Sequence, residues 1–493
     1  MFSYYNHLGF NNPYFFDQKG TFIIKQKLSD LLSEFDGVRR IDPVAVIELL
    51  NKNYMFGDRT LIQGICRTPW LAKPDELLKK WEFYSGPKHD LIDINEEEIA
   101  RTLFQKICSE IQLCIGEKEK VGLLLSGGMD SRIVAGTLDH LMKTNKLENI
   151  EVTAMTWGNE GTRDVVYAKE IALRLNWKWK HYTVTAIDLL NNIKETAIHG
   201  CEYSPIHLHA IPQIRDDNNL DIILAGSYGD SIGRAEYSGK NVRYLKPVLR
   251  GISSLRRIIY QSVFENSIKY IENDVHRYHI QFPEKEPYMQ YELDYQLHYM
   301  RRMLNPCMEL LTEKMNFYQV FTHPDIFGYI WSINPERRNS LVYKYMLQEF
   351  ITKLDDIPWA RTGLPFGQEK GTPDLYLKDH HSYANIIKNE ILNKIETLII
   401  SNEIKKLRIF NQGGLKQLVN LVKFFPSKDL IYPEKLIWLA SLAEMTKIYN
   451  IQGLDYKNPN QYWSENNLLS VPIEYFITQI KNLITTILKR MSN

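Results

Sequence analysis

The middle of the chain alternates between two patterns of hydrophobic and polar residues. Short apolar runs, typical of buried strands, occur at 120–125, 150–156, 181–184 and 220–225. Between them, residues 132–141 and 165–175 repeat their apolar side chains at helical spacing. Alternation of this kind predicts an α/β fold, in which a parallel sheet carries helices on both faces.

The regions on either side follow other patterns. Residues 96–115 combine helical spacing with three glutamates in the first turn, which predicts a helix. Beyond residue 245 the pattern is mostly helical, with helices expected at 253–263, 291–304, 341–354, 437–449 and 472–491. The last of these has an apolar stripe, which favours packing against the core over an interfacial membrane helix. We therefore divide the chain into a small N-terminal α+β region at 1–92, an α/β core at 93–245 and a mostly helical region at 246–493.

Composition narrows the classes of protein. A chain of 493 residues has room for two or three domains. Its formal charge of +1 argues against a general affinity for nucleic acids or other polyanions. The five cysteines are scattered without a C-x-x-C pair, and the sequence has neither a signal-like start nor a run of about 18 apolar residues. We expect a reduced, cytoplasmic protein without a membrane span.

The most specific motif follows the first apolar run. Ser126-Gly127-Gly128-Met129-Asp130-Ser131 places two glycines between a strand and a helix, where backbone N–H groups meet an anion. The serine hydroxyls are donors for phosphate oxygens, and the carboxylate suits a Mg²⁺ ion held against those phosphates. The motif lacks the Lys-Ser/Thr of a Walker loop. A plain serine-capped turn would explain Ser-Gly-Gly alone, but not the whole motif after a strand.

This motif resembles the pyrophosphate-binding loop (PP-loop) of the N-type ATP pyrophosphatases, which split ATP into AMP and pyrophosphate and so activate a carboxyl or amide oxygen. Three other stretches resemble the asparagine synthetase branch of that group, namely 53–62 with 80–84, 155–158 and 224–231. Residues 318–334 and 357–367, more thinly, resemble the helical substrate side of the same family.

The resemblance implies ATP and Mg²⁺ as cofactors. It places Mg²⁺ between Asp130 and Asp230, which are also the expected catalytic carboxylates. A family lysine that steadies the reaction intermediate has two candidate counterparts here, Arg361 and Lys370, and the choice stays open, since only lysine loses its proton readily when buried. The nucleotide-binding residues implied are Leu125, Ser126, Gly127, Gly128, Asp130, Ser131, Thr156, Gly226 and Gly229.

The sequence also departs from the family. The family's glutamine-hydrolysing half begins with a cysteine nucleophile as residue 2, where this chain has Phe2. We therefore expect 1–92 to be a truncated remnant of a glutaminase-like domain that hydrolyses no glutamine, with Cys66 a buried small residue. Ser227 replaces a family glutamate tied to amide formation on aspartate, so the resemblance implies an amide product other than asparagine.

These observations predict an AMP-forming carbon–nitrogen ligase. A small-molecule, peptide or sugar carboxylate would become an acyl-AMP, and an amine or ammonia, from the substrate or from a partner enzyme, would displace AMP. Relatives of this kind serve surface polysaccharide and peptide natural-product synthesis. Two alternatives stay open: a PP-loop enzyme acting on tRNA, and a catalytically silent scaffold. The sequence identifies neither the carboxylate nor the amine.

We expect several other polar residues to be structural or exposed to solvent. His207 and His209, like His380 and His381, lack a cysteine or acidic partner at metal-ligand spacing, so we expect structural or surface histidines. Glu202, ahead of a proline-containing loop, is expected to be a solvated glutamate.

Overall fold

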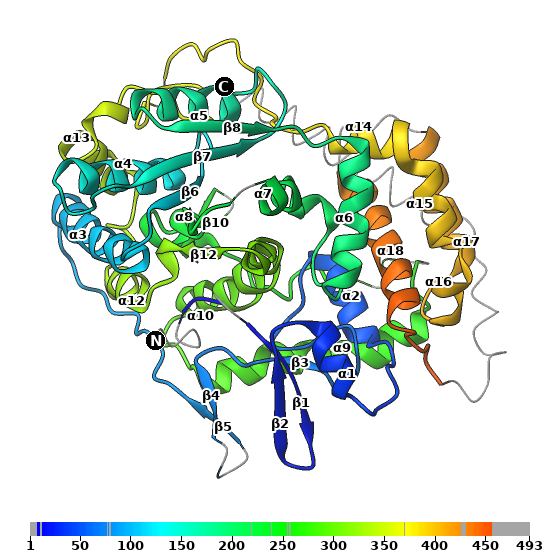
Figure 1. Ribbon diagram of the computed structural model, residues 1–493. Helices are drawn as coiled ribbons and strands as arrows, with labels where there is room; N and C mark the ends of the chain where they lie inside the picture. The colour runs from blue at the N-terminus through cyan, green and yellow to red at the C-terminus, as the bar shows by residue number, and fades with distance from the viewer. Residues whose placement is uncertain are drawn as a thin grey trace.

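A five-stranded parallel sheet forms the centre of the computed structural model (Figure 1). The structure describes residues 7–9, 12–75, 77, 80–217, 219–237, 239–253, 255, 258–368, 370–424 and 430–455. The strands run in the order β12-β9-β6-β7-β8, and each neighbouring pair is parallel. They are β6 (Lys120–Leu124), β7 (Glu151–Trp157), β8 (Lys178–Tyr182), β9 (Ile222–Ala225) and β12 (Asn316–Gln319). The α/β class predicted from the sequence is confirmed.

The strand connections create a crevice at the middle of this sheet. From β6 the chain moves outward to β7 and β8, and it then returns to the other side of β6 to form β9. The helices of the outward connections pack against the strands, and further helices lie in the return connection from β8 to β9. These helices are α4 (Met129–Lys143), α5 (Arg163–Arg174), α6 (Ala186–Ile198) and α7 (Ile211–Asp217). The carboxyl ends of β6 and β9 therefore lie where strand order reverses, the usual place for a ligand in such sheets.

Most elements predicted from local patterns are present. Helix α3 (Glu96–Ile115) has the predicted bounds, and the Asn95 side chain caps it by accepting the Glu98 N–H at 2.8 Å. Strand β8 ends at Tyr182, two residues before the expected strand end. The helix expected at 472–491 lies outside the described residues.

One helix prediction for the C-terminal region is wrong, and one strand of this mostly helical region was not predicted. The helix expected at 253–263 starts only at Gln261, because the preceding segment pairs with another part of the chain, Ile259 bridging to Phe410. The region predicted to be helical also supplies the edge strand β12. Its four residues, Asn-Phe-Tyr-Gln, form no apolar run, so tertiary pairing with β9 creates the strand.

The remaining C-terminal elements are helical, as predicted. A π-helix, Tyr295–Leu304, continues α10, and α14 to α18 stand together beside α6 (Figure 1). The helices are α9 (Gln261–Gln281), α10 (Pro287–Asp294), α11 (Asn305–Glu309), α12 (Pro324–Ser332), α13 (Ser340–Glu349), α14 (Tyr383–Ile386), α15 (Leu392–Ile399), α16 (Asn402–Lys406), α17 (Gln412–Phe424) and α18 (Ile431–Ile448). Among the described helices, none is both long enough and apolar enough to cross a bilayer.

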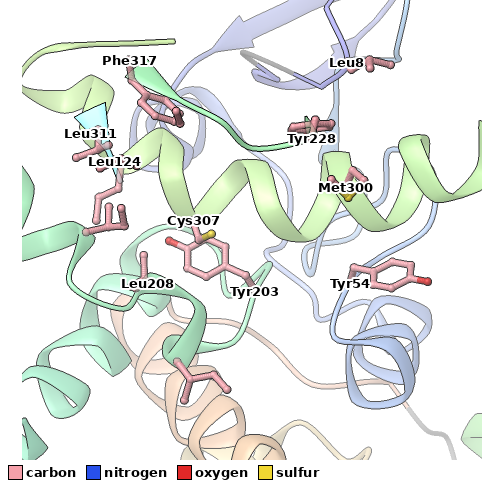
Figure 2. Close-up of a cluster of buried hydrophobic side chains, with 14 of the residues drawn as sticks. Leu8, Tyr54, Leu124, Tyr203, Leu208, Tyr228, Met300, Cys307, Leu311 and Phe317 are labelled. Carbon is pink, nitrogen blue, oxygen red and sulfur yellow. The ribbon is translucent and has the colours of Figure 1, made fainter. Parts of the chain in front are cut away.

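The N-terminal region packs into the same core as the rest. Its elements are β1 (Tyr14–Gln18), β2 (Thr21–Lys25), α1 (Leu28–Glu34), α2 (Pro43–Lys52), β3 (Cys66–Arg67), β4 (Ala72–Asp75) and β5 (Lys80–Phe83). Figure 2 shows Leu8 and Tyr54 from this region in one cluster with Met300 and Cys307 from the helical region and Leu124 from β6. The division at residue 92 stays a prediction, and the hydrophobic core runs across it.

A buried ion network joins the N-terminal region to the helices. Glu202, expected to be solvated, is 0 % exposed. Its carboxylate accepts hydrogen bonds from Arg67 Nε at 3.1 Å and from Arg302 Nη2 at 2.9 Å. Arg302 also donates to the Gly57 carbonyl at 2.6 Å. The expectation was wrong because burial, which local sequence does not reveal, decides the role of a glutamate.

This network generates a stability prediction. Glu202→Gln leaves two buried guanidinium groups without a countercharge and should lower the free energy of unfolding by about 3–5 kcal/mol. Urea denaturation measures the change. Glu97→Gln is the control, because its pair with Arg101 is exposed and should cost less than about 1 kcal/mol. Equal stability of the two variants would contradict the network's role.

Candidate active site

The Ser126–Ser131 motif forms a closed loop between β6 and α4. The Ser126 N–H donates to Ser131 Oγ at 3.1 Å, and the two hydroxyl oxygens lie 3.2 Å apart. The Gly128 N–H donates to Ser126 Oγ at 3.1 Å. The two serines therefore hold the loop in shape, in addition to presenting hydroxyls at the amino end of a helix.

A buried arginine fastens this loop to the segment at 354–361. Arg132 donates to the carbonyls of Ile357 at 2.6 Å and Pro358 at 2.7 Å, and the Gly127 carbonyl accepts the Ala360 N–H at 3.1 Å. Burial lowers the pKa of Arg132 to about 9, because removal from water disfavours the charged form, and the nearby Arg174 charge adds to this effect. Sequence reasoning gave Arg132 no role beyond starting a helix. Its partners Ile357 and Pro358 are more than 200 residues away in the chain.

Two aspartates meet at the crevice between β6 and β9. Asp130 lies in the first turn of α4, and Asp230 in the short helix α8 (Gly229–Gly233) that follows β9. A Cβ atom on Gly229 would lie 2.5 Å from Asp130 Cβ, so only glycine allows this approach. The predicted meeting of Asp130 and Asp230 at the two strand ends is therefore present in the structure.

The two carboxyl groups have opposite electrostatic character. Burial, and then the neighbouring Asp230 charge, raise the pKa of Asp130 well above its ordinary value. Burial alone would also raise the pKa of Asp230, but a hydrogen bond from Asp130 and the guanidinium groups of Arg234 and Arg361 hold it below its ordinary value. The Oδ1 atom of Asp130 is buried without a hydrogen-bond partner among the described residues. A carboxylate oxygen left in this way, beside a second carboxylate, suits Mg²⁺ as a ligand pair.

Two arginines surround the pair. Arg234 forms an ion pair with Asp230, and Arg361 Nη2 lies 3.0 Å from Asp230 Oδ2. Arg361 Nη1 also donates to Glu236 at 2.8 Å, and its guanidinium carbon lies 4.4 Å from the ring centre of Trp359. Arg234, four residues after Asp230, was missed, although that spacing is a signal for a helical ion pair.

Arg361 and Lys370, the two candidate counterparts of the family lysine, have different surroundings in the structure. Arg361 lines the cavity beside Asp230. Lys370 is exposed and is absent from the lining of both cavities at the crevice. A catalytic role for either residue stays a prediction, and the contacts of Arg361 support that residue.

Two cavities open at the carboxyl ends of the strands. The smaller, of about 300 Å³, is lined by seven of the predicted nucleotide-binding residues: Leu125, Ser126, Gly128, Asp130, Ser131, Thr156 and Gly226. Gly127 and Gly229 are not among the residues that line it. The larger cavity, of about 1190 Å³, is bordered by Arg361, Trp359 and the segment at 378–389. Gly128, Asp130, Asp164 and His380 line both cavities, so the two meet at these residues.

A strap formed by residues 374–381 brings His380 to this junction. The Arg163 N–H donates to the Leu377 carbonyl at 2.9 Å, and the Asn159 N–H donates to the His380 carbonyl at 2.8 Å. A Cβ on Gly158, whose φ is +137°, would lie 2.9 Å from that same carbonyl. Sequence reasoning missed Asp164 and His380 as site residues, because backbone contacts between distant segments leave no motif.

A separate group of candidate metal ligands lies near the edge strand. Ligand atoms of His7, Glu110 and His323 fall within 4.8 Å of one another. The Nδ1 atom of His323 accepts the Asp325 N–H at 3.3 Å, and its Nε2 atom lies 3.4 Å from Glu110. Glu110 also pairs with the hydroxyl of Tyr318, which lies 3.1 Å from His7 Nε2. The geometry is that of a hydrogen-bonded network.

The central part of the chain is similar to a known protein family. Residues 111–255 match the family model described as asparagine synthase, which confirms the resemblance found in the motifs. A probable glutamine-hydrolysing asparagine synthetase of Acanthamoeba polyphaga mimivirus is 25% identical over 162 residues, 31% of this chain and 28% of that protein. The match thus spans less than a third of the relative's length.

Two solved structures show weaker likeness. One is the U34-tRNA thiolase NcsA from Methanococcus maripaludis with its 4Fe-4S cluster, at a TM-score of 0.25 and 14% identity over 51% of this chain and 65% of that chain. The other is NMN synthetase from Francisella tularensis, at a TM-score of 0.20 and 15% identity over 36% and 72%.

The close approach of the two strand ends generates a binding prediction. A Cβ on Gly226 would lie 2.6 Å from the Ser131 backbone nitrogen and 2.7 Å from the Asp130 carbonyl carbon. Gly226→Ala must push the two loops apart, at about 1–3 kcal/mol, so ATP·Mg²⁺ should bind roughly tenfold more weakly in calorimetry. Gly328→Ala on α12 is the control, since open space surrounds that position. Unchanged ATP affinity in Gly226→Ala would contradict this assignment of the loops.

Proposed function

For a chain that carries an asparagine synthase domain, we propose an ATP-dependent amide synthetase that activates a carboxylate as an acyl-adenylate and transfers the acyl group to an amine or ammonia. The observation that carries the proposal is the position of the Ser126–Ser131 loop and of Asp130 and Asp230 at the reversal point of the sheet. Two cavities, of about 300 Å³ and about 1190 Å³, open at that point.

The chain's own groups account for most of the chemistry. The first turn of α4 offers N–H groups to the pyrophosphate part of ATP, and the hydrogen-bonded loop before it holds that turn in position. Asp130 and Asp230 would hold Mg²⁺, which neutralises phosphate charge and favours departure of pyrophosphate. Arg361, already at Asp230, is placed to steady negative charge on the adenylate.

The larger cavity supports an acceptor bigger than a free amino acid. Its volume of about 1190 Å³ exceeds the usual range for small-molecule sites. Amide groups of Asn385 and Asn389, with the Lys388 side chain, border it. Such a lining suits the polar, extended carboxylate of a peptide or a sugar acid, which agrees with the replacement of the family glutamate by Ser227.

The bond that is cleaved in ATP tests the proposal directly. With ATP, Mg²⁺, an amine and its true carboxylate substrate, the protein should release AMP and pyrophosphate in equal amounts. Nucleotide chromatography and a coupled pyrophosphate assay measure both products. Release of ADP and orthophosphate would contradict acyl-adenylate formation, and AMP release that requires tRNA in place of a carboxylate would favour the tRNA alternative.

The aspartate pair generates a second prediction. Asp130→Asn and Asp230→Asn should each lower turnover at least roughly 100-fold, because metal charge stabilisation is worth several kcal/mol. Asp93→Asn, at an exposed pair with Arg337, is the control. Near wild-type turnover in either site variant would exclude that residue as a ligand.

Asp130→Asn should lower activity but raise stability relative to the wild type at higher pH. The raised pKa of Asp130 means that its charged form opposes folding, so the wild type loses stability as pH rises from the ordinary carboxyl pKa through the raised one. An asparagine side chain at this position carries no such titration. Without Mg²⁺, thermal unfolding should therefore show Asp130→Asn gaining stability relative to the wild type as pH increases, while it stays inactive.

A further inference from the structure

His380 occupies a distinctive place in the site. It is one of the four residues that line both the smaller and the larger cavity, with Gly128, Asp130 and Asp164. Its side chain is half-buried, and its Nδ1 atom lies 3.8 Å from Asp164 Oδ2. The reacting carboxyl group must meet both the nucleotide and the amine, so it must lie where the two cavities join.

We propose that His380 is the general base that removes a proton from the amine as it attacks the acyl-adenylate. This inference rests on the proposed function. In the step, the amine nitrogen forms a bond to the acyl carbon and the bond from that carbon to the AMP oxygen breaks. AMP leaves with the electron pair of that bond. The proton from nitrogen passes to His380 Nε2, and from there to water.

The imidazole is suited to this task by its surroundings. Burial lowers the pKa of His380, and the nearby Asp379 carboxylate opposes that shift only in part. The other groups that face it are Asp164, His209 and His381, and burial also lowers the pKa of both histidines. The ring is therefore neutral at neutral pH and free to accept a proton.

The other residues that line both cavities have other contacts or other proposed roles. Asp164 accepts a hydrogen bond from the Gly127 N–H, and so belongs to the wall of the phosphate loop. Asp130 is assigned to the metal pair, and Gly128 has no side chain. Among the residues that line both cavities, His380 is thus left as the proton acceptor, with Asp164 placed to stabilise the imidazolium that forms.

Two nucleophiles distinguish a base from a structural residue. Amide formation with ammonium chloride needs a proton acceptor, whereas hydroxylamine is unprotonated at neutral pH and attacks with less help. The wild type is first screened with ATP, Mg²⁺ and hydroxylamine against l-aspartate, an acylated peptide and glucuronate, and AMP release identifies a working carboxylate. His380→Gln is then compared with each nucleophile.

We expect His380→Gln to lower amide formation at least about 100-fold and hydroxamate formation less than about fivefold, as general-base catalysis contributes roughly 10²–10⁴-fold. The wild-type amide rate should fall as pH decreases through the pKa of His380, and the variant should lack that limb. His276→Gln, an exposed histidine on α9, is the control and should match the wild type.

Some outcomes would contradict only the role of His380, and others would contradict the proposed function as well. Equal loss with both nucleophiles, or wild-type amide formation in His380→Gln, would overturn the base assignment and leave the proposed function standing. A wild type that releases no AMP with any of the carboxylates, while its thermal unfolding shows a folded protein, would overturn the proposed function and this inference with it.

Discussion

The arrangement of the site depends on two carboxyl groups that lie side by side and are largely shielded from water. Asp130 and Asp230 repel each other when both are charged, and burial strengthens that repulsion. A hydrogen bond between the two aspartates and the guanidinium groups of Arg234 and Arg361 offset this repulsion. These groups meet at the crevice between β6 and β9. The absence of a side chain at Gly229 allows their close approach.

The same constraint explains why distant segments converge. Arg361 reaches Asp230 because the segment that carries it is held against the Ser126–Ser131 loop by Arg132. The loop, the two carboxyl groups and the Arg361 side of the larger cavity therefore form one connected structure, and a shift in any of them changes the electrostatic balance of the other two.

The elements that were predicted correctly are those whose own sequence pattern determines their structure. Helix α3 and strands β6, β7 and β9 have a periodicity of their own, and two aspartates that each follow a parallel strand are expected to meet. The aromatic, polar strand β12 and the extended segment before α9 have no such periodicity, because their pairing with other segments creates them. Buried Glu202 could not be told from a solvated glutamate for the same reason.

The site was predictable to the extent that it depends on contiguous motifs. The Ser126–Ser131 loop and Asp230 carry a signature of residue types at fixed spacing. His380 carries none, since it is placed by backbone contacts between the strap and the end of β7, and Arg234 carries only a weak one.

The way in which the strap is attached has a consequence for how the site can change. Main-chain atoms of Asn159, Arg163 and Gly161 and the ion pair between Arg163 and Asp374 hold it, while the side chains of Leu375 and Leu377 are exposed. Substitution of either leucine should therefore leave the path of the strap intact. Sequence change at such exposed positions can alter the surface next to the larger cavity without displacing His380, so we expect related proteins to differ there first.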